Sequence, residues 1–366
     1  MRKVKMLVEA VIFLLLVAIL RLTIEIGLSK QAATSLFMKA SSSWMIDIVP
    51  GHPIWICMAE IGPIIALILL ASLLYKTIVN ISCHGIWQFV VMGTLSSYML
   101  IALHWGSESS IPVIALLLQR IGRNYIPRII YAIGLGQLLL LTFGKCFDED
   151  KAVYCRRSLV LKTLAILSAL SSTIITLSGK QGSWVALAFL IGGYCIKSLD
   201  RIEENAIDGG IGSFTLSPLA VTQWHLLAVC LFFATGHWCA FDGLRYGAAF
   251  IGFDEFILVR QAILLTIDTF GFSLFLPVFG LPLLASGQYL SDKTDHRRSP
   301  LFVQLYQMYM MYGFIVATAV TATIICVAIQ RRHLMVWGLF APKFVFDVVG
   351  LILTDVLICL ALLFFS

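Results

Sequence analysis

The sequence predicts an all-α protein, a polytopic bundle of about ten transmembrane helices with no soluble domain. Of its 366 residues, 60% are hydrophobic and 13% are charged, and the mean hydropathy is +0.94. These values lie far outside the range of soluble proteins. The apolar residues also come in long runs. A bilayer core about 30 Å thick needs roughly 20 apolar residues per helix, so each run predicts one crossing.

Ten apolar runs can be placed in this way. The sixth is short for a crossing, and the eighth contains Pro277 and Pro282. Proline in a membrane helix interrupts the backbone hydrogen bonds and favours a bend around a cavity. The runs cover residues 7–27, 54–75, 86–104, 125–143, 159–177, 184–196, 219–235, 257–285, 305–329 and 344–365.

The first run follows the basic start MRKVKM and in this respect resembles a signal peptide. It carries Glu9, Arg21 and Glu25 and lacks a small-residue cleavage site, so a retained helix is favoured. Glu9 and Glu25 fit positions near the two membrane surfaces. Arg21 lies deeper and is expected to face the bundle.

Lysine and arginine fall almost equally on the two sides of the membrane when the N-terminus is placed in the cytosol, a weak bias under the positive-inside rule. On the opposite face the cations gather at helix ends, around 120–128, 245–260 and 331–343. Cations held there against the rule indicate an anionic ligand. The net charge of +6 is compatible with such a ligand.

Sequence signatures of soluble enzymes are missing. There is no GxSxG, HExxH or DxDxDG stretch. His225 and His237 would lie about 18 Å apart along one helix, too far to share a metal ion. Most of the nine cysteines lie in or near the apolar runs, and Cys146 and Cys155 share a loop on the predicted cytosolic side, so no disulfide framework is predicted.

Glu60, Asp268 and Asp355 are the best examples of acidic residues inside predicted helices. A charge in hydrocarbon costs about 3 kcal/mol or more and usually faces the bundle interior. Each residue is therefore either a ligand or proton site or the structural partner of a neighbouring helix, and the pattern leaves both open. The prolines that follow Asp268 favour a functional role for it.

Two boundary stretches combine charge with aromatic residues. FFATGHWCAFDGLRYGAAFIGFDE occupies 232–255, and RRHLMVWGLFAPKFVFD occupies 331–347. The second predicts a cationic amphipathic hairpin, typical of a lipid headgroup site but also of an ordinary interfacial anchor. Composition alone favours the anchor. The two stretches fall on the same predicted face, which favours a shared polar pocket.

Three stretches taken in order carry a resemblance to a known family: TGHWCAFDGLRYGAAFIGF at 235–253, TIDTFGFSLFLPVFGLPLL at 266–284 and RRHLMVWGLFAPKFVFD at 331–347. Together they resemble the C-terminal membrane region of the GPI ethanolamine phosphate transferases, most closely the transferase 3 (class O) type in its plant form. Weaker similarity, such as IPRII at 126–130, extends the match across most of the chain. The family tends to have Gln in place of Trp238 and Asn in place of Asp268.

The resemblance implies a multi-pass enzyme of the endoplasmic reticulum membrane, with a cytosolic N-terminus. Such enzymes move phosphoethanolamine from phosphatidylethanolamine to the growing GPI glycolipid, onto its third mannose for this class. Their chemistry is carried by a luminal domain with a threonine nucleophile and a pair of zinc ions. A small multi-span membrane subunit stabilises them.

Compared with the domain organisation of this family, residues 1–366 are expected to form a single C-terminal transmembrane region, with the luminal catalytic domain and several upstream helices absent. No residue is assigned as nucleophile or metal ligand, and no cofactor is expected in this chain. The expected function is substrate binding without catalysis by the chain alone. The alternatives are a non-catalytic scaffold or regulator of the full-length enzyme and, less favoured, a secondary transporter with Asp268 at a midplane site.

In the family, the luminal helix ends form a polar chamber that lipids can enter. The basic groups are expected to engage phosphate, and His237 and Asp242 to bond sugar or ammonium groups. The residues expected to line this chamber are His237, Asp242, Arg245, Asp268, Arg331, Arg332, His333 and Lys343.

Overall fold

The fold is seen in a computed structural model of the whole chain. The structure describes residues 4, 7–16, 18, 53–81, 86–107, 124–143, 156–207, 218–237, 244–285, 301–330 and 334–365. Within these ranges, side chains are described except at 53–60, 78–81, 86–87, 107, 156–158, 201–207, 301, 330 and 334–342. The described residues form helices joined by turns and contain no strand. The predicted all-α class is confirmed.

Each predicted run coincides with a helix or helical segment as far as it is described; most of the second half of the first run, with Arg21 and Glu25, lies outside the described residues. Seven described helices are long and apolar enough to cross a membrane, and three shorter apolar helices, Leu7–Leu16, Ile61–Thr77 and Pro218–Ala234, occupy the remaining runs. The uninterrupted helices are α3 (Pro53–Ile81), α4 (Ile86–Ser107), α6 (Tyr125–Phe143), α7 (Arg156–Ser178), α8 (Lys180–Ile207), α9 (Pro218–Ala234), α13 (Leu301–Gln330) and α14 (Leu334–Phe365).

α8 and α14 extend furthest beyond the apolar runs that predict them. The sixth run was predicted to end at 196, but α8 continues to Ile207 because the helix extends past its apolar part into the polar residues at 197–207. The tenth begins at Leu334 instead of 344, so the predicted cationic hairpin is helical from Leu334 onward, and residues 331–333 lie outside the described residues. At the start of α8, Gly179 has φ 70°, the left-handed conformation that ends α7.

The eighth run is broken, as its prolines predict. It consists of α10 (Leu258–Phe270), a π-helical turn η4 (Gly271–Phe275), α11 (Leu276–Gly280) and α12 (Pro282–Ala285). Pro282 has no N–H to give to the Val278 carbonyl one turn earlier. The hydroxyl of Tyr309 on α13 donates to that carbonyl at 3.1 Å, and the Trp224 indole on α9 donates to the Pro277 carbonyl at 3.0 Å. Neighbouring helices thus satisfy the broken backbone.

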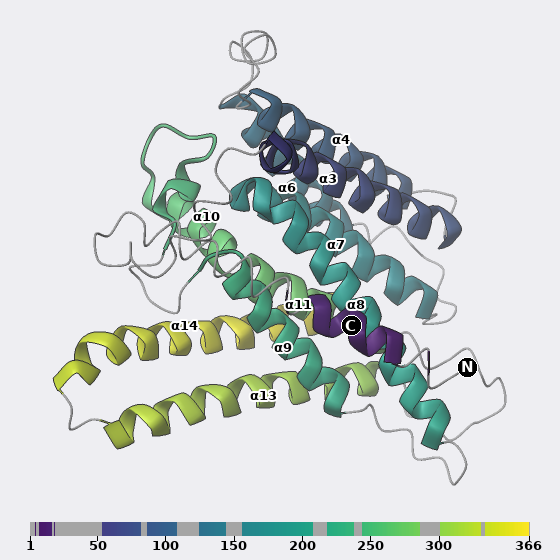
Figure 1. Cartoon of the computed structure of the whole chain (residues 1–366). Coiled ribbons are helices and arrows are strands. Elements are labelled where there is room, and N and C mark those ends of the chain that lie inside the picture. Colours follow the sequence, from purple (N-terminus) through teal and green to yellow (C-terminus); the bar gives the residue numbers. More distant parts are fainter. Residues whose placement is uncertain are drawn as a thin grey trace.

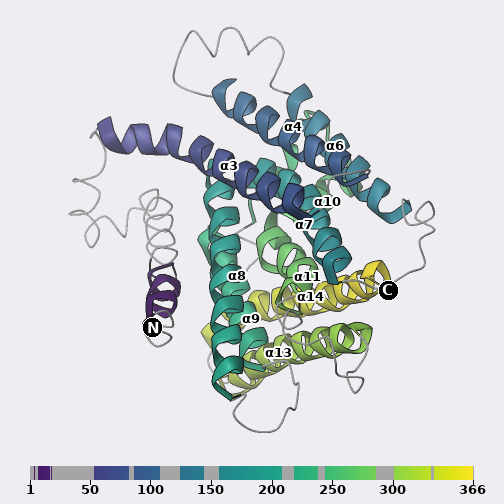
Figure 2. The same ribbon diagram turned by 90° about the vertical axis from the view of Figure 1, so that its right-hand side faces the viewer.

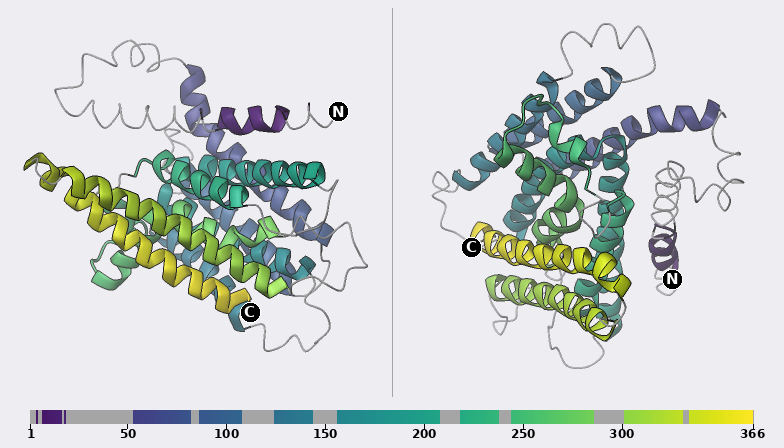
Figure 3. Two further views of the ribbon diagram at one scale, coloured as in Figure 1. Left: turned by 90° about the horizontal axis from the view of Figure 1, so that it is seen from below. Right: turned by 90° about the vertical axis from the view of Figure 1, so that its left-hand side faces the viewer.

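The helices pack around α7. It contacts α3, α4, α6, α8 and α10, and most of its apolar stretch is buried inside the protein. In Figure 1, α3, α4 and α6 lie on one side of this centre, while α13 and α14 lie side by side on the other. Figures 2 and 3 show the same layering from other directions, with α8, α9 and α11 between the two groups. The residues at 244–257 join the end of α9 to α10 at one end of this bundle.

Candidate functional site

Three predicted site residues meet between the end of α9 and the last turn of α10. Gly236, at φ 80°, turns the chain after α9 and directs His237 inward. Arg245 immediately precedes the short 3-10 helix η3 (Tyr246–Phe250), and Asp268 lies in the last turn of α10, before the π-helical turn. Residues far apart in sequence therefore converge at the broken helix, where π-bulges often accompany functional sites.

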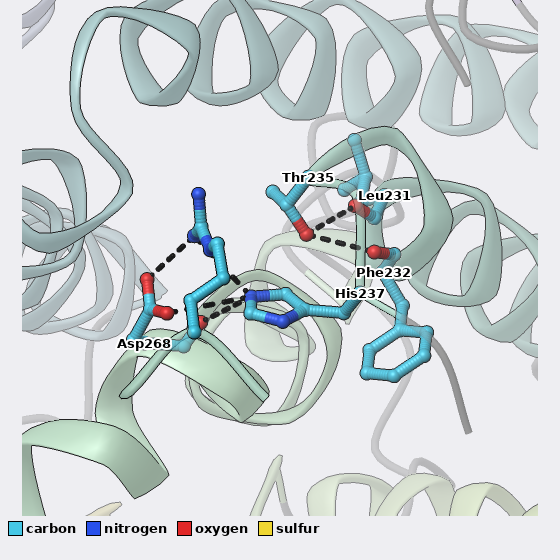
Figure 4. Close-up of polar contacts among 6 residues, drawn as sticks. Leu231, Phe232, Thr235, His237 and Asp268 are labelled. Carbon is cyan, nitrogen blue, oxygen red and sulfur yellow. Dashed lines mark hydrogen bonds and ion pairs between the residues drawn. The ribbon is translucent and has the colours of Figure 1, made fainter. Parts of the chain in front are cut away.

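The contacts among these residues are short and buried. Arg245 Nη2 donates to Asp268 Oδ1 at 2.6 Å, and the Asp268 side chain is fully buried, whereas that of Arg245 is 32% exposed. His237 Nε2 lies 3.1 Å from the main-chain carbonyl oxygen of Asp268 and 3.7 Å from its Oδ2. Figure 4 shows the imidazole pointing at Asp268, with the Phe232 ring on its other side. Asp268 therefore forms a buried ion pair with Arg245.

The environment keeps His237 neutral. Burial lowers its pKa to about 3, with the adjacent Arg245 charge adding to the effect and the Asp268 carbonyl acting weakly against it. His237 Nε2 lies 3.1 Å from the Asp268 carbonyl oxygen and 3.4 Å from Arg245 Nη2, while Nδ1 has no hydrogen-bond partner. The shorter contact assigns the proton of the neutral ring to Nε2, which donates to the carbonyl. The single positive charge of Arg245 then balances the single negative charge of Asp268. His237 acts as a neutral donor that holds the turn after α9 against α10.

This neutral state predicts a pH dependence. A histidine with pKa about 3 when folded and near 6.5 when unfolded binds fewer protons in the folded state, so its contribution to stability is full above about pH 6.5 and is lost as the pH falls toward 3. We expect His237→Asn to reduce the acid sensitivity of the unfolding midpoint between these pH values, measured in detergent. The carboxylates titrate in both proteins, so the difference between the two pH curves of the unfolding midpoint reports the contribution of His237. Parallel pH curves would contradict this account.

The other predicted residues are placed less fully. Asp242, Arg331, Arg332 and His333 lie outside the described residues. Lys343 is half-buried in α14, one turn before Asp347. Near it, the Phe346 ring packs against Phe232 and Phe270 at centroid distances of 5.8 and 5.3 Å. The 331–347 stretch and the 232–255 stretch therefore meet through aromatic packing, and the shared polar pocket stays a prediction.

A cavity of about 730 Å³ lies beside this site, and the sequence analysis did not identify its lining. It is formed by the ends of α4 and α7, the start of α6 and the residues at 247–254. His237, Arg245 and Asp268 are not in its wall. Its lining comprises His104, Trp105, Asn124, Thr176, Gly179, Gly247, Phe250, Ile251, Gly252, Phe253 and Asp254.

Hydrogen bonds from Asn124 and Arg128 hold the 251–254 segment against α6. Arg128 Nε donates to the Gly252 carbonyl at 2.6 Å, and Asn124 Nδ2 donates to Asp254 Oδ2 at 2.5 Å. Gly252 has φ 86°, and a Cβ placed there would be 3.0 Å from Pro127 Cβ. The close approach therefore needs glycine. The sequence showed that cations gather near 120–128 and 245–260. It did not show that these two stretches contact each other.

The guanidinium groups of two arginines contact the ring of Phe253. The guanidinium carbons of Arg260 and Arg128 lie 4.0 and 5.0 Å from its ring centroid, within cation–π range. Arg128 bonds the Gly252 carbonyl and Arg260 the Glu255 carbonyl. Within the described part of the chain, neither arginine forms an ion pair with a carboxylate. Neither arginine is itself among the residues that line the cavity; both contact it through Phe253, which does line it.

No donor set for zinc is found in the part of the chain that the structure describes. No three His, Cys, Asp or Glu residues are grouped there closely enough to hold a metal ion. The zinc chemistry implied by the resemblance therefore has no fitting site among these residues.

Comparison with known proteins places this site in context. Residues 196–365 match the family model described as the GPI ethanolamine phosphate transferase membrane region. The catalytic subunit of human GPI ethanolamine phosphate transferase 3 is 31% identical over 179 residues, and the mouse protein is 32% identical over 182 residues. Each alignment covers 40% of this chain but only 16% of the human and 17% of the mouse protein. No solved structure matches.

The matched region contains the cluster of His237, Arg245 and Asp268 (the His237 cluster), the 247–254 wall of the cavity and the helices α13 and α14. The resemblance seen in the three quoted stretches is thus confirmed: residues 196–365 of this chain match the membrane region of the GPI ethanolamine phosphate transferase family, whereas the weaker similarity at 126–130 lies outside the matched residues.

Proposed function

We propose that this chain acts in GPI-anchor biosynthesis as the substrate-binding membrane part of an ethanolamine phosphate transferase. The observation that carries the proposal is the large cavity whose 247–254 wall falls within the family match. Its lining combines the Asp254 carboxylate with the aromatic rings of Trp105, Phe250 and Phe253, a mixture suited to the polar end of a lipid. The apolar helices around it would let that lipid enter from the bilayer.

The finer parts of the proposal follow the family. The donor is phosphatidylethanolamine, the acceptor is the third mannose of the GPI precursor, and the membrane is that of the endoplasmic reticulum, with a cytosolic N-terminus. The chain binds substrate without transferring the group by itself, and a small multi-span subunit is its partner. The second candidate, a scaffold or regulator of the full-length enzyme, would need no ligand in the cavity.

The test is capture of the acceptor lipid. The tagged chain is expressed in cells lacking transferase 3, which are labelled with radioactive mannose, and the lipids that co-purify are separated. We expect a mannosylated GPI intermediate with the intact chain and several-fold less with Gly247→Leu. Gly247 lines the cavity, and a Cβ there meets no atom within 4 Å, so the larger side chain would occupy open space.

Gly136→Leu provides the matched control, since Gly136 also faces open space but lies outside the cavity lining. Equal capture by the two variants, or no capture by the intact chain, would favour the scaffold. In the same cells we expect no return of GPI-anchored proteins to the surface. Their return with this chain alone would overturn the proposal that it does not catalyse.

A further inference from the structure

A narrow groove of about 90 Å³ opens where α3 meets α7 and α8 (Figure 2). It is lined by residues of these three helices, by Tyr98 of α4 and by Leu276, the first residue of α11. On α3, Leu73 and Thr77 are exposed at its rim, whereas Tyr98 and Leu276 are buried. The groove therefore leads from the outer surface of the bundle inward to the broken helix.

The lining of the groove suits an apolar ligand. Among the described residues that line it, none is charged, and every hydroxyl has a hydrogen-bond partner within the protein. Thr77 and Ser168 donate to main-chain carbonyls of their own helices at 2.7 and 2.8 Å. Ser171 Oγ donates to the Ser168 carbonyl at 2.8 Å and accepts from the Tyr98 hydroxyl at 2.7 Å. An apolar cavity whose polar groups are satisfied in this way stays dry and takes apolar ligands.

The groove runs from one membrane surface toward the middle of the bilayer. Thr77 is the last residue of the apolar helix Ile61–Thr77, so the rim of the groove lies near a membrane surface. Leu276 lies inside the apolar segment Leu258–Ala285, roughly 14 Å from its nearer end at a rise of 1.5 Å per residue. Half of a bilayer core is about 15 Å thick, so the inner end of the groove lies near the midplane. This is the path of an acyl chain within one leaflet.

The groove and the larger cavity of about 730 Å³ open on opposite halves of the membrane. Helix α7 contributes Leu164 near its start to the groove, and Thr176 near its end to the larger cavity. These two residues are about 18 Å apart along the helix axis at a rise of 1.5 Å per residue. A lipid chain in the groove therefore belongs to a different molecule from a ligand in the larger cavity.

We propose that this groove binds one acyl chain of a bilayer phospholipid, taken from the leaflet opposite the larger cavity. At this depth the bundle is surrounded by hydrocarbon, so an acyl chain is the occupant that the membrane supplies. An empty groove would forfeit dispersion contacts along its buried wall, and its satisfied hydroxyls give water no partner. Because the described lining carries no charge, the groove selects the chain and not the headgroup. This inference goes beyond the proposed function and does not depend on it.

A bound chain would pack against the break in the eighth run. Its inner end would contact Phe189 and Leu276, which both line the groove. The Phe189 ring meets the Trp224 indole edge to face at a centroid distance of 5.3 Å, and that indole donates to the Pro277 carbonyl. The chain would therefore support a contact that satisfies the broken backbone, and lipid is expected to stabilise the folded protein.

The experiment is photo-crosslinking of the full purified chain in phosphatidylcholine nanodiscs. One phosphatidylcholine probe carries a diazirine at the end of an acyl chain, and the other carries it next to the ester. We expect the chain-end probe to label Phe189 and Leu276, and the ester-side probe to label Leu73 and Thr77. Phe189 and Leu276 are only 4% and 2% exposed, so lipid on the outer surface does not reach them. No label on these two residues, or the same pattern with both probes, would overturn the inference.

Thr77→Trp is designed to close the rim and leave the buried wall intact, because Thr77 is exposed. We expect several-fold less labelling of Phe189 and Leu276 but unchanged labelling of Phe89, an exposed ring on α4 outside the groove. Ser72→Trp is the matched control, since Ser72 is also an exposed α3 residue whose hydroxyl bonds the preceding turn, but it does not line the groove. The site is wrong if the two variants label the buried pair equally.

A second variant fills the groove from its wall. Ala186 is buried there, and Ala186→Leu places additional carbon atoms where the chain would lie. In detergent, added phosphatidylcholine is expected to raise the unfolding midpoint of the intact chain and of Ser72→Trp, and to raise that of Ala186→Leu several-fold less. An equal rise in all three proteins would contradict binding in the groove.

Two further probes test the chemical class of the occupant. Chain-end probes with phosphatidylglycerol and phosphatidylcholine headgroups should label Phe189 and Leu276 alike, and a strong preference for either headgroup would contradict recognition of the chain. A small share of cholesterol in the nanodisc should lower the labelling only in proportion to the dilution. A several-fold loss would show that the groove takes a sterol, and the assignment to an acyl chain would be wrong.

Discussion

Replacing Arg245 by Met is expected to destabilise the folded protein by about 2–3 kcal/mol. The change leaves the Asp268 carboxylate, whose side chain is fully buried, without its 2.6 Å partner. Removal of one member of a fully buried pair typically costs 3–5 kcal/mol, and the partial exposure of Arg245 reduces that value. The measurement is the unfolding midpoint in detergent, followed by intrinsic fluorescence, with Lys76→Met, an exposed cation on α3, as control.

A second variant identifies the cause. Arg245→Met combined with Asp268→Asn removes both charges, and the resemblance implies that Asn is the usual residue at this position in the family. We expect the double variant to recover most of the lost stability, because burying a neutral amide costs much less free energy than burying an unpaired carboxylate. If the double variant is as unstable as Arg245→Met, the loss comes from packing of the arginine stem and not from charge.

Replacing Gly252 by Val is expected to separate the 251–254 segment from α6. The substitution forces a β-branched residue into a left-handed conformation and brings a Cβ to 3.0 Å from Pro127 Cβ. Backbone strain of this kind costs about 1–3 kcal/mol, and the clash adds to it. The expected result is a lower unfolding midpoint together with several-fold less capture of the GPI intermediate, since the bonds from Arg128 and Asn124 depend on this approach.

Gly247→Ala serves as the control for Gly252. Gly247 lies in the same segment, has no positive φ and has open space beside it, so alanine should be tolerated. Unchanged capture of the GPI intermediate by Gly252→Val would show that the cavity does not depend on the contact with α6.

The two stretches singled out by composition differ in what the structure shows of them. In the 232–255 stretch, His237 and Arg245 converge on Asp268, and the outcome is a compensated ion pair with a neutral imidazole. In the 331–347 stretch, the part from Leu334 is helical, and the described contact with the first stretch is made by Phe346. Binding of phosphate or sugar by the eight predicted residues stays a prediction.

The sequence by itself determined the helical membrane class, the positions of the apolar segments and the break in the eighth one, because lipid allows only a backbone that is satisfied within each segment and proline removes a donor. Its motifs also pointed to the family. Only the tertiary structure decided that Asp268 is paired with Arg245 and that Asn124 and Asp254 share a cavity wall. These contacts join residues from separate segments, and hydropathy along the chain says nothing about which segments lie together.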